Sequence, residues 1–257
     1  MPSSSTTRKP RPVNAFAAGA LRNRGDAGRS GEQGASSRHY RRAQRDRGAD
    51  TRARLIDAAL DVFGRLGFEG ASTREIAKEA DANLAAIVYH FGSKEALHVA
   101  VAEHIVARVR ERIGRGIAAA ALPEATATPE GARAALANLV ANLVDVLLGD
   151  ADAERWARFI IREQMQPTAA FDVIFGFMGP AHGIATRLVA VALGREEDEE
   201  ARIRCFTILG QVMVFRVAQT LVLRRMNWHS IGEPEREKIK RIVIAQAMTI
   251  LDAEGTA

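Results

Sequence analysis

The stretch from residue 72 to residue 91 constrains this chain most, because it holds the start signals of two short helices separated by a tight turn. Ser72 and Glu75 form a capping box, in which the hydroxyl and the carboxylate each satisfy a backbone N–H at a helix start. Asn83 is a good cap for a second helix directly after the interruption at residues 81–82. Two short helices joined by such a turn are typical of the helix-turn-helix, whose second helix enters the DNA major groove.

A further helix is expected in front of this pair, ending at Gly67 in a left-handed conformation. Its apolar residues recur at helical spacing, and they are Leu55, Ala59, Val62, Phe63 and Leu66. Ser93 is expected to cap the helix that follows the pair. The first three helices can then enclose one small core.

These segments together resemble the N-terminal domain of the TetR/AcrR family of bacterial transcriptional regulators, over residues 51–101. The matching segments occur in order and with the family's spacing at residues 54–63, 67–73, 76–80 and 89–97. One departure is Asp81, where the family usually has glycine in the turn. Asp tolerates a positive φ, so the turn is expected to survive.

The second half is similar to a CerR-type C-terminal domain found in one TetR subgroup. This resemblance rests on residues 158–171, 209–218 and 223–228, and the two resemblances cover roughly residues 51–253. No stretch shows strand alternation, so we expect an all-α protein. Its predicted parts are a disordered basic tail (1–49), a helix-turn-helix DNA-binding domain (50–112), and a helical ligand-binding and dimerisation domain (113–257).

The predicted tail carries all the excess positive charge of the chain. Residues 1–50 hold eleven Lys and Arg against four Asp and Glu, whereas the remaining residues hold twenty-five against twenty-seven. A segment rich in Ser, Gly and Ala with few large apolar residues cannot offset the entropy of ordering. The tail is either a basic arm that adds phosphate contacts or a segment without function, including one read from a mistaken start codon.

In the C-terminal part, helices are expected at residues 130–148, 151–164, 168–178 and 180–194, with breaks near Gly149, Pro167 and Gly179. A long helix that begins near residues 196–200 is apolar around most of its circumference through 201–225. The family resemblance implies that the last two long helices pack against the same pair of a second subunit. We therefore expect a homodimer with two-fold symmetry, which reads a palindromic operator in double-stranded DNA.

The recognition surface is expected on the second helix of the pair. We predict DNA contacts from Thr73, Arg74, Asn83, Leu84, Ala85, Ala86, Val88, Tyr89, His90 and Lys94, with Ile87 and Phe91 turned inward. By resemblance to the family, Thr73, Tyr89, His90 and Lys94 contact phosphate. The shortage of polar groups favours apolar contact with thymine methyls, one Asn–adenine pair or shape recognition over an arginine–guanine code. For Tyr89 and His90 the alternative is packing between helices.

The resemblance also implies that a small molecule enters the C-terminal domain and alters the spacing of the recognition helices. Aromatic and polar residues that together suit an apolar pocket with a few polar anchors are Trp156, Phe159, Glu163, Phe175, Met178, His182, Gln211 and Phe215. The ligand itself cannot be named, although an aromatic or amphipathic compound fits this mixture. The alternative is an ordinary aromatic core.

Signals for catalysis, a cofactor or a metal are absent from the sequence: there is no phosphate loop, dinucleotide glycine pattern or paired cysteine, and the six histidines show no i, i+4 pair. Cys205 is the single cysteine, which fits a reducing cytoplasm, with the protein at the nucleoid when bound to DNA. No uninterrupted apolar run approaches the ~20 residues of a membrane span, so no membrane partner is expected.

Three functions therefore remain: a ligand-responsive regulator, most often a repressor in this family, which is favoured; a non-specific architectural DNA-binding protein; and a small-molecule carrier or enzyme whose DNA-binding domain has decayed. Discrete binding sites distinguish the first from the second, because non-specific binding shows a steep salt dependence and no sequence preference.

Overall fold

The computed structural model describes residues 29–149 and 151–252, with side chains from residue 47 onward. The chain divides into two units after Arg47, and the contacts described below lie in the second. No strand occurs in the described ranges, so the predicted all-α fold is confirmed. The elements are α1 (Arg29–Gly70), α2 (Thr73–Glu79), α3 (Leu84–Phe91), α4 (Lys94–Ala120), the 3₁₀ turn η1 (Pro123–Thr126), α5 (Pro129–Gly149), α6 (Ala153–Met165), α7 (Ala169–Ala192), α8 (Glu199–Val217), α9 (Gln219–Met226) and α10 (Glu233–Asp252).

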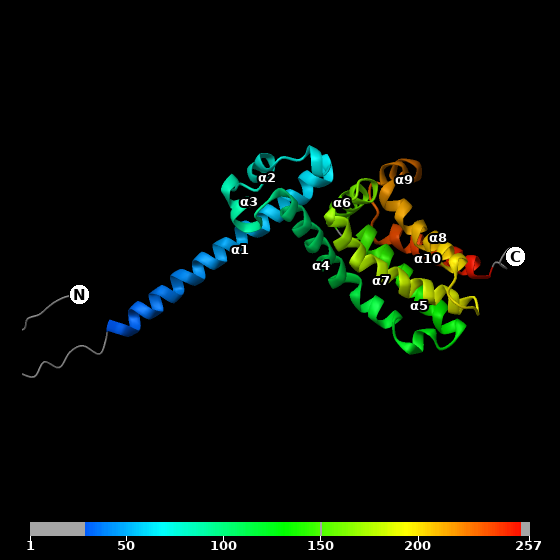
Figure 1. Cartoon of the computed structure of the whole chain (residues 1–257). Helices are drawn as coiled ribbons and strands as arrows, with labels where there is room; N and C mark the ends of the chain where they lie inside the picture. The colour runs from blue at the N-terminus through cyan, green and yellow to red at the C-terminus, as the bar shows by residue number, and fades with distance from the viewer. Residues whose placement is uncertain (1–28, 150, 253–257) are drawn as a thin grey trace, which may run out of the picture. The chain divides into compact units, whose positions relative to one another are not determined.

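The long helix α4 joins the small N-terminal helices to a bundle made by the C-terminal helices (Figure 1). It begins beside α3 and then packs against α5 and α7 along its length. In the bundle, α5 also contacts α8 and α10, and α7 contacts α8. One continuous helix therefore connects the two parts in which DNA binding and ligand binding are expected.

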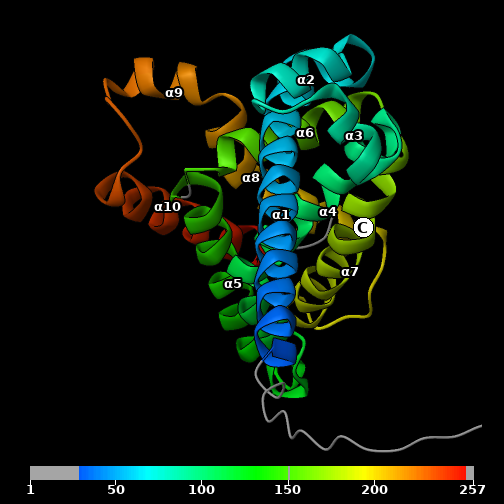
Figure 2. The same ribbon diagram turned by 90° about the vertical axis from the view of Figure 1, so that its left-hand side faces the viewer.

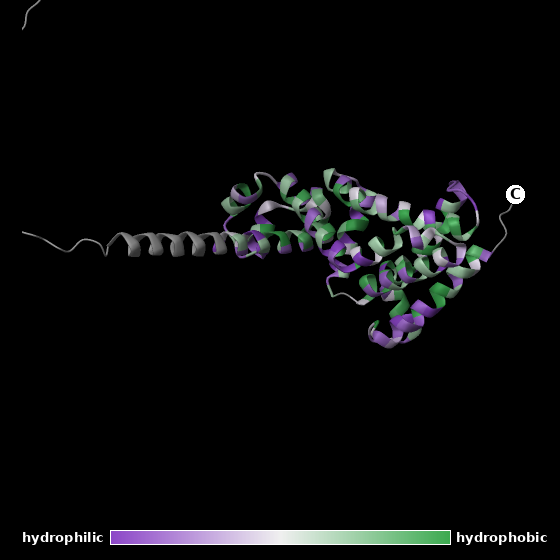
Figure 3. Cartoon of the chain, turned by 90° about the horizontal axis from the view of Figure 1, so that it is seen from below, coloured by the Kyte–Doolittle hydropathy of each residue, from purple (hydrophilic) through white to green (hydrophobic). Residues whose placement is uncertain are grey.

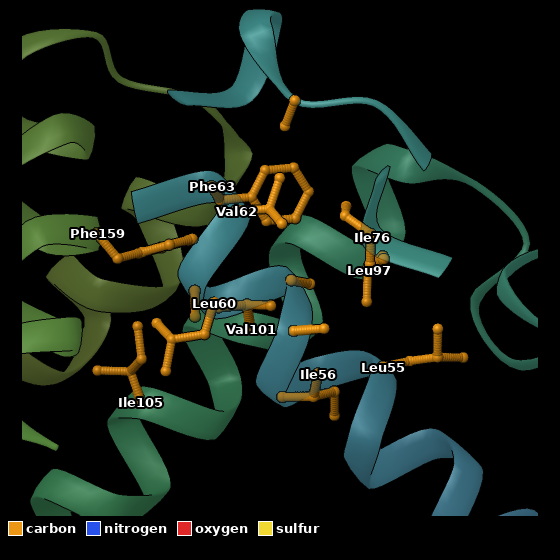
Figure 4. Packing of buried hydrophobic residues seen from close by; sticks show 14 of the residues in the cluster. Leu55, Ile56, Leu60, Val62, Phe63, Ile76, Leu97, Val101, Ile105 and Phe159 are labelled. Carbon is orange, nitrogen blue, oxygen red and sulfur yellow. The ribbon is translucent and has the colours of Figure 1, made fainter. Parts of the chain in front are cut away.

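The N-terminal core is closed by side chains from both parts of the protein. Phe63 of α1, Ile76 of α2 and Leu97 of α4 are fully buried against one another, and Phe159 of α6 enters the same cluster (Figure 4). Fully burying one such side chain contributes roughly 1.5–3 kcal/mol. Because α6 supplies part of this core, the helix-turn-helix unit packs directly against a C-terminal helix and is not connected to the bundle through α4 alone.

A second core lies between the bundle helices. It includes Leu136 and Val140 of α5, one turn apart on the same face, with Leu188 of α7, Ile208 of α8 and Val243 of α10. The i, i+4 spacing in α5 places these side chains in one row toward the centre of the bundle.

Residues 29–49 differ from the sequence prediction, because they belong to α1 and not to a disordered segment. Residues 38–47 contain several Arg with Ala and Gln, which are good helix formers, and the compositional argument for disorder gave this local preference no weight. The rest of the predicted tail, residues 1–28, lies outside the described residues.

The expected break near Gly179 is absent, and α7 runs unbroken through Pro180. A proline inside a helix removes one hydrogen bond and clashes with the carbonyl four residues earlier. Here that residue is Gly176, and both it and Pro180 are exposed. A backbone carbonyl on an exposed face can bond to water instead, which reduces the cost of keeping the helix whole.

The expected helix over 201–225 is divided at Ala218, where α8 and α9 meet at an angle of 76° (Figure 2). Neither glycine nor proline marks this position, so the sequence carried no break signal. Arg216, just before the bend, is buried and donates to the Leu147 carbonyl and to Gln219 Oε1, 2.8 Å away. Tertiary bonds of this side chain therefore accompany a bend that local preference does not explain.

Two features of the C-terminal part bear on the predicted absence of a membrane partner. By length and composition alone, α5 and α7 could each cross a membrane, and α8 with α9 could form a third, bent span. The search for an uninterrupted apolar run did not find these helices because charged residues interrupt both of them. Hydrophilic and hydrophobic residues are interleaved along the chain (Figure 3). Both helices contribute buried residues to the second core, so their apolar composition already has a use within the fold.

Candidate DNA interface and ligand cavity

The first helix of the pair begins as predicted, but only half of the capping box forms. Ser72 Oγ accepts a hydrogen bond from the Glu75 N–H at 3.1 Å, while the Glu75 carboxylate lies 3.9 Å from the Arg65 guanidinium. Among the hydrogen bonds of the described residues, the reciprocal bond from the Ser72 N–H to Glu75 is not formed. Gly67 ends the preceding helical stretch with a positive φ of 75°, and its ψ of 175° is extended, a combination essentially restricted to glycine.

The turn survives the replacement of glycine by Asp81, as predicted. Asp81 has a φ of 47°, its N–H donates to the Lys78 carbonyl, and the Ala82 N–H donates to the Ala77 carbonyl. This pair of bonds is the Schellman arrangement, which satisfies the last carbonyls of a helix. Arg54 Nη1 from α1 also donates to the Ala80 and Asp81 carbonyls at 2.9 and 3.0 Å. The sequence reading missed Arg54, which fixes the turn to α1.

The second helix, α3, is capped and anchored in the way its sequence indicates. Asn83 Oδ1 accepts from the Ala85 N–H at 2.9 Å. Ile87 is buried, and Phe91 is half-buried with the Arg52 guanidinium 5.1 Å from its ring centroid. The opposite side of α3 faces solvent, with the Tyr89 side chain 84% exposed. The helix therefore presents one free face while its inner face is held by the core.

The ten residues predicted to contact DNA come from α2, the cap and body of α3, and the start of α4, with different accessibility. Exposed are Arg74, Asn83, Leu84, Ala85, Val88 and Tyr89, whereas Thr73, Ala86, His90 and Lys94 are half-buried. The Lys94 ammonium lies 4.4 Å from the centroid of the Phe68 ring, a cation–π contact. The His90 ring packs edge-on against Tyr89 and lies near Gly48 of α1. Part of the His90 side chain is thus used for packing, while Tyr89, apart from this ring contact, faces solvent.

Two arginines on α6 form hydrogen bonds with α1 of the DNA-binding unit. Arg155 donates to both oxygens of Asp61, at 2.7 and 2.9 Å, and to Asp57 at 2.8 Å. Burial opposes its charge, but the hydrogen bonds to Asp61 and Asp57 outweigh burial and raise the pKa of the guanidinium. Arg162 Nε donates to the Gly64 carbonyl at 2.9 Å. These contacts join α6 to the surface of α1.

A buried polar cluster lies beside these arginines. His98 of α4 packs against Phe63, and its Nε2 lies 3.5 Å from Glu163 Oε1. Glu163 accepts from the N–H and the hydroxyl of Thr168 at 3.1 and 2.9 Å. Burial, and then the nearby Lys94 ammonium, lower the pKa of His98 to about 4, so its contact with Glu163 is that of a neutral ring. His98 was not among the predicted site residues, because it lacks a partner close in sequence.

An apolar cavity of about 340 Å³ lies among α4, α5, α6, α7 and α8. Most of its wall is Ile, Leu, Val, Met, Phe and Trp, with polar side chains at Asn142, Gln164 and His182. Burial lowers the pKa of His182, and its Nδ1 has no hydrogen-bond partner among the described residues. A neutral imidazole in an apolar wall can form a hydrogen bond with a ligand.

Three of the eight predicted pocket residues line this cavity: Trp156, Met178 and His182. The prediction was wrong for the other five as cavity-lining residues. Phe159 and Glu163 lie on the side of α6 that faces the N-terminal core, and Phe175 is exposed on α7. Gln211 and Phe215 are half-buried outside the cavity wall. Residue type indicated the correct helices, but the rotation of each helix decides which side chains face the cavity.

Residues that the sequence reading missed form most of the cavity wall. They include Ile105, Val109 and Ile113, which recur along one face of α4, and Leu143 of α5. Their helical spacing is the available signal, but it is shared by ordinary core residues. A second hollow of about 440 Å³ is lined by charged residues that pair with one another, such as Lys240 and Asp145 at 2.7 Å. It is less suited to an apolar ligand.

The described residues contain no group of three His, Cys, Asp or Glu side chains placed to hold a metal ion. Cys205 is buried in the second core, and burial raises the pKa of its thiol. The arrangement is that of a helix-turn-helix protein with a separate apolar cavity.

Comparison with known proteins agrees with this class. Residues 55–101 match the model described as bacterial regulatory proteins of the tetR family, and residues 132–254 match the C-terminal domain of the HTH-type transcriptional dual regulator CecR. The CecR protein of Shigella flexneri is 34% identical over 211 residues, which cover 80% of this chain and 93% of that protein. The repressor NicS of Pseudomonas putida is 44% identical over 57 residues, covering 22% and 27% of the two chains.

Solved structures show the same fold. AibR in complex with isovaleryl coenzyme A and operator DNA has a TM-score of 0.57 at 14% identity, covering 76% of this chain and 97% of that one. FadR of Bacillus subtilis in complex with stearoyl-CoA has a TM-score of 0.50 at 17% identity, covering 78% and 95%.

The chain therefore belongs to the TetR family of bacterial transcriptional regulators, as the sequence predicted. The C-terminal domain called CerR-type above is the CecR-type domain. This protein is a DNA-binding regulator of the bacterial cytoplasm and not an enzyme.

Proposed function

We propose that this regulator is a homodimeric repressor, which binds a palindromic operator and is released by a small apolar or amphipathic ligand. The observation that carries the proposal is the coexistence of a free recognition face on α3 and an apolar cavity, joined by the uninterrupted helix α4. We further propose domain limits of 50–112 and 113–257. α4 crosses the border between them and can carry a displacement from one to the other.

The exposed residues of α3 support reading by shape and by apolar contact. Leu84, Ala85 and Val88 can meet thymine methyl groups, and Asn83 could pair with adenine if its capping bond is given up. Arg74, in the first turn of α2, is an exposed cation that can also reach a base. Tyr89, Thr73, His90 and Lys94 would hold the DNA backbone, which fixes position without reading sequence.

Dimerisation would place two copies of α3 in successive major grooves, about 34–36 Å apart. The exposed apolar side chains of α8 and α10, such as Phe206, Val217 and Ile242, support an interface made by these helices. A two-fold dimer requires an approximately palindromic operator. When bound there, the protein would be associated with the nucleoid.

The cavity supports a ligand with an apolar body and few polar groups. His182, Asn142 and Gln164 offer hydrogen bonds to such a ligand. AibR and FadR, which share the fold, were solved with acyl-coenzyme A molecules, and an acyl chain fits the lining found here. A ligand relieves repression only if it prefers the dimer geometry that does not fit DNA.

The test is selection of genomic fragments by the purified full chain at physiological salt, followed by sequencing of the bound DNA. We expect a few palindromic sites, and a protein with Val88→Asp should recover none of them. A matched control is Arg115→Glu, which changes an exposed residue of α4 outside α3 and outside the proposed interface helices. Diffuse recovery with a steep salt dependence would instead support the architectural function. Failure to recover any DNA would support the carrier function.

The basic segment 1–49 is proposed as an arm that adds phosphate contacts. Removing it should reduce the slope of log affinity against log salt, because each lost phosphate contact lowers that slope by about 0.9. An unchanged slope would show that the segment takes no part in binding.

A further inference from the structure

One side chain belongs both to the cavity and to the molecular surface. Phe206 of α8 lines the apolar cavity, and its ring centroid lies 4.9 Å from that of His182, yet 64% of its surface is exposed. Gly210, one turn further on, also lines the cavity and is exposed. A Cβ added there would meet nothing within 4 Å. Along this part of α8 the wall between cavity and solvent is therefore a single layer.

The exposed face of α8 around this thin wall lacks charge. Its exposed residues between the first turn and the helix end are Arg202, at its edge, followed by the uncharged Ile203, Phe206, Thr207, Gly210, Val214 and Val217. Arg204 and Arg216, which interrupt this sequence, turn away to bond Glu200 and the Leu147 carbonyl. A face of about four turns without an exposed charge is unusual for a helix in contact with water and suits a protein interface.

The same face continues onto the neighbouring helix. α10 packs against α8, and after the exposed Arg241 its exposed residues before Asp252 are uncharged, namely Ile242, Ala245, Gln246 and Thr249. Five large side chains of these two helices are more than half exposed, and these are Ile203, Phe206, Val214, Val217 and Ile242. At about 100 Å² each they supply ~500 Å², more than half of the ~800 Å² that each partner buries in a stable interface.

We propose that a second copy of this chain covers this face and closes the cavity at Phe206 and Gly210, so that the ligand site is complete only in the dimer. This inference rests on the proposed homodimer. A second copy is the fitting occupant because a two-fold axis places an uncharged face against itself, so no charge is buried without a partner. The exposed Gly183 of α7, where an added Cβ would also meet open space, leaves room beside α8 for a close approach.

This arrangement links ligand binding to subunit association. A compound in the cavity would touch the partner subunit or side chains held by it, so it would bind the dimer more tightly than the monomer. By linkage, it would favour the dimer to the same extent. Occupancy of the site could then alter the packing of the two subunits directly, in addition to any movement carried by α4.

Trp156 gives a direct test because it lines the cavity and is buried. Its fluorescence is isolated by Trp228→Phe, and access to the cavity is measured by quenching with acrylamide. Dissociation is produced by dilution, followed by sedimentation, and by Val217→Asp, which changes the uncharged face at a residue outside the cavity wall. Arg115→Glu is the control, because it changes an exposed charge on α4, outside α8 and α10.

We expect the quenching constant of Trp156 to rise at least threefold in the monomer with unchanged helical circular dichroism, and to stay at the dimer value in the control. Equal quenching in dimer and folded monomer would overturn the inference while leaving the dimer intact. A chain that sediments as a monomer at every concentration would overturn the dimer as well.

Phe206→Ala provides a second test that needs no dissociation. If the partner covers this position, the shortened side chain leaves quenching in the dimer within about 1.5-fold of the parent. If solvent covers it, the cavity opens and quenching rises several-fold in the dimer, which contradicts the proposal.

Discussion

Arg155 of α6 donates two hydrogen bonds to Asp61 of α1, one of 2.7 Å from Nε to Oδ1 and one of 2.9 Å from Nη2 to Oδ2. The same helix presents Trp156 to the cavity. A displacement of α6 by a ligand would therefore act on α1, and through Arg54 on the turn before the recognition helix.

Removing the hydrogen bonds between Arg155 and Asp61 should weaken the attachment of α6 to α1. Arg155→Gln is expected to lower the free energy of unfolding by about 1–3 kcal/mol, because it leaves the partly buried Asp61 without its charged partner. Arg158→Gln on the same helix breaks only an exposed pair with Glu154 and should cost less than about 0.5 kcal/mol. Urea denaturation measures both. Equal losses would show that the Arg155 pairs add nothing beyond an ordinary surface contact.

The turn of the helix-turn-helix offers a prediction of opposite sign. Asp81→Gly should stabilise the protein by about 0.5–1 kcal/mol, because glycine adopts the observed positive φ without steric cost. In Asp81→Ala the residue must still adopt a positive φ, which alanine does less readily than aspartate. This variant should therefore destabilise the protein by a similar amount. Thermal unfolding of the two variants gives the comparison. A glycine variant less stable than the parent would mean that the exposed Asp81 side chain, 3.9 Å from Arg54, matters more than the backbone.

Which of these features the sequence revealed depended on how local their cause is. The caps at Ser72, Asn83 and Ser93 were predictable because each involves neighbours within three residues. Arg155, His98 and the bend at Ala218 were not, since their partners lie far along the chain or their cause is tertiary.

The predicted pocket shows the same limit within single helices. Trp156 and Phe159 lie three residues apart on α6, and composition could not tell that the first faces the cavity and the second the N-terminal core. The recognition face was easier to predict, because a helix anchored by Ile87 must turn its other side outward.

Acid should destabilise the protein through His98. The pKa of His98 is lowered from 6.5 in a solvated chain to about 4 in the fold, chiefly by burial and then by Lys94. Between these values the unfolded chain binds the proton and the folded chain does not, so stability is full above pH 6.5 and falls as the pH drops toward 4. The lowered pKa values of His104 and His182 act in the same direction.

The measurement is the free energy of unfolding from pH 7 to pH 4. His98→Gln should remove about 1–3 kcal/mol of the loss across this range, since a single group contributes at most about 1.4 kcal/mol per pH unit. His229→Gln is the matched control. If both variants keep the parent's pH profile, the titration of His98 plays no part in acid sensitivity.

Filling the cavity should separate DNA binding from ligand release. Ala181 of α7 lines the cavity and is half-buried, so Ala181→Leu adds apolar volume where no side chain stands now. The added contacts are expected to raise stability by about 0.5–2 kcal/mol, as cavity-filling changes commonly do. Affinity for the selected operator should stay within about twofold, because the substitution lies outside α3 and its core, while the concentration of ligand needed for release rises by at least tenfold.

Fluorescence anisotropy of labelled operator, titrated with acyl thioesters of increasing length, measures both quantities. Ala192→Leu, at a buried position outside the cavity wall, distinguishes this effect from general overpacking, since it should lower stability without raising that concentration.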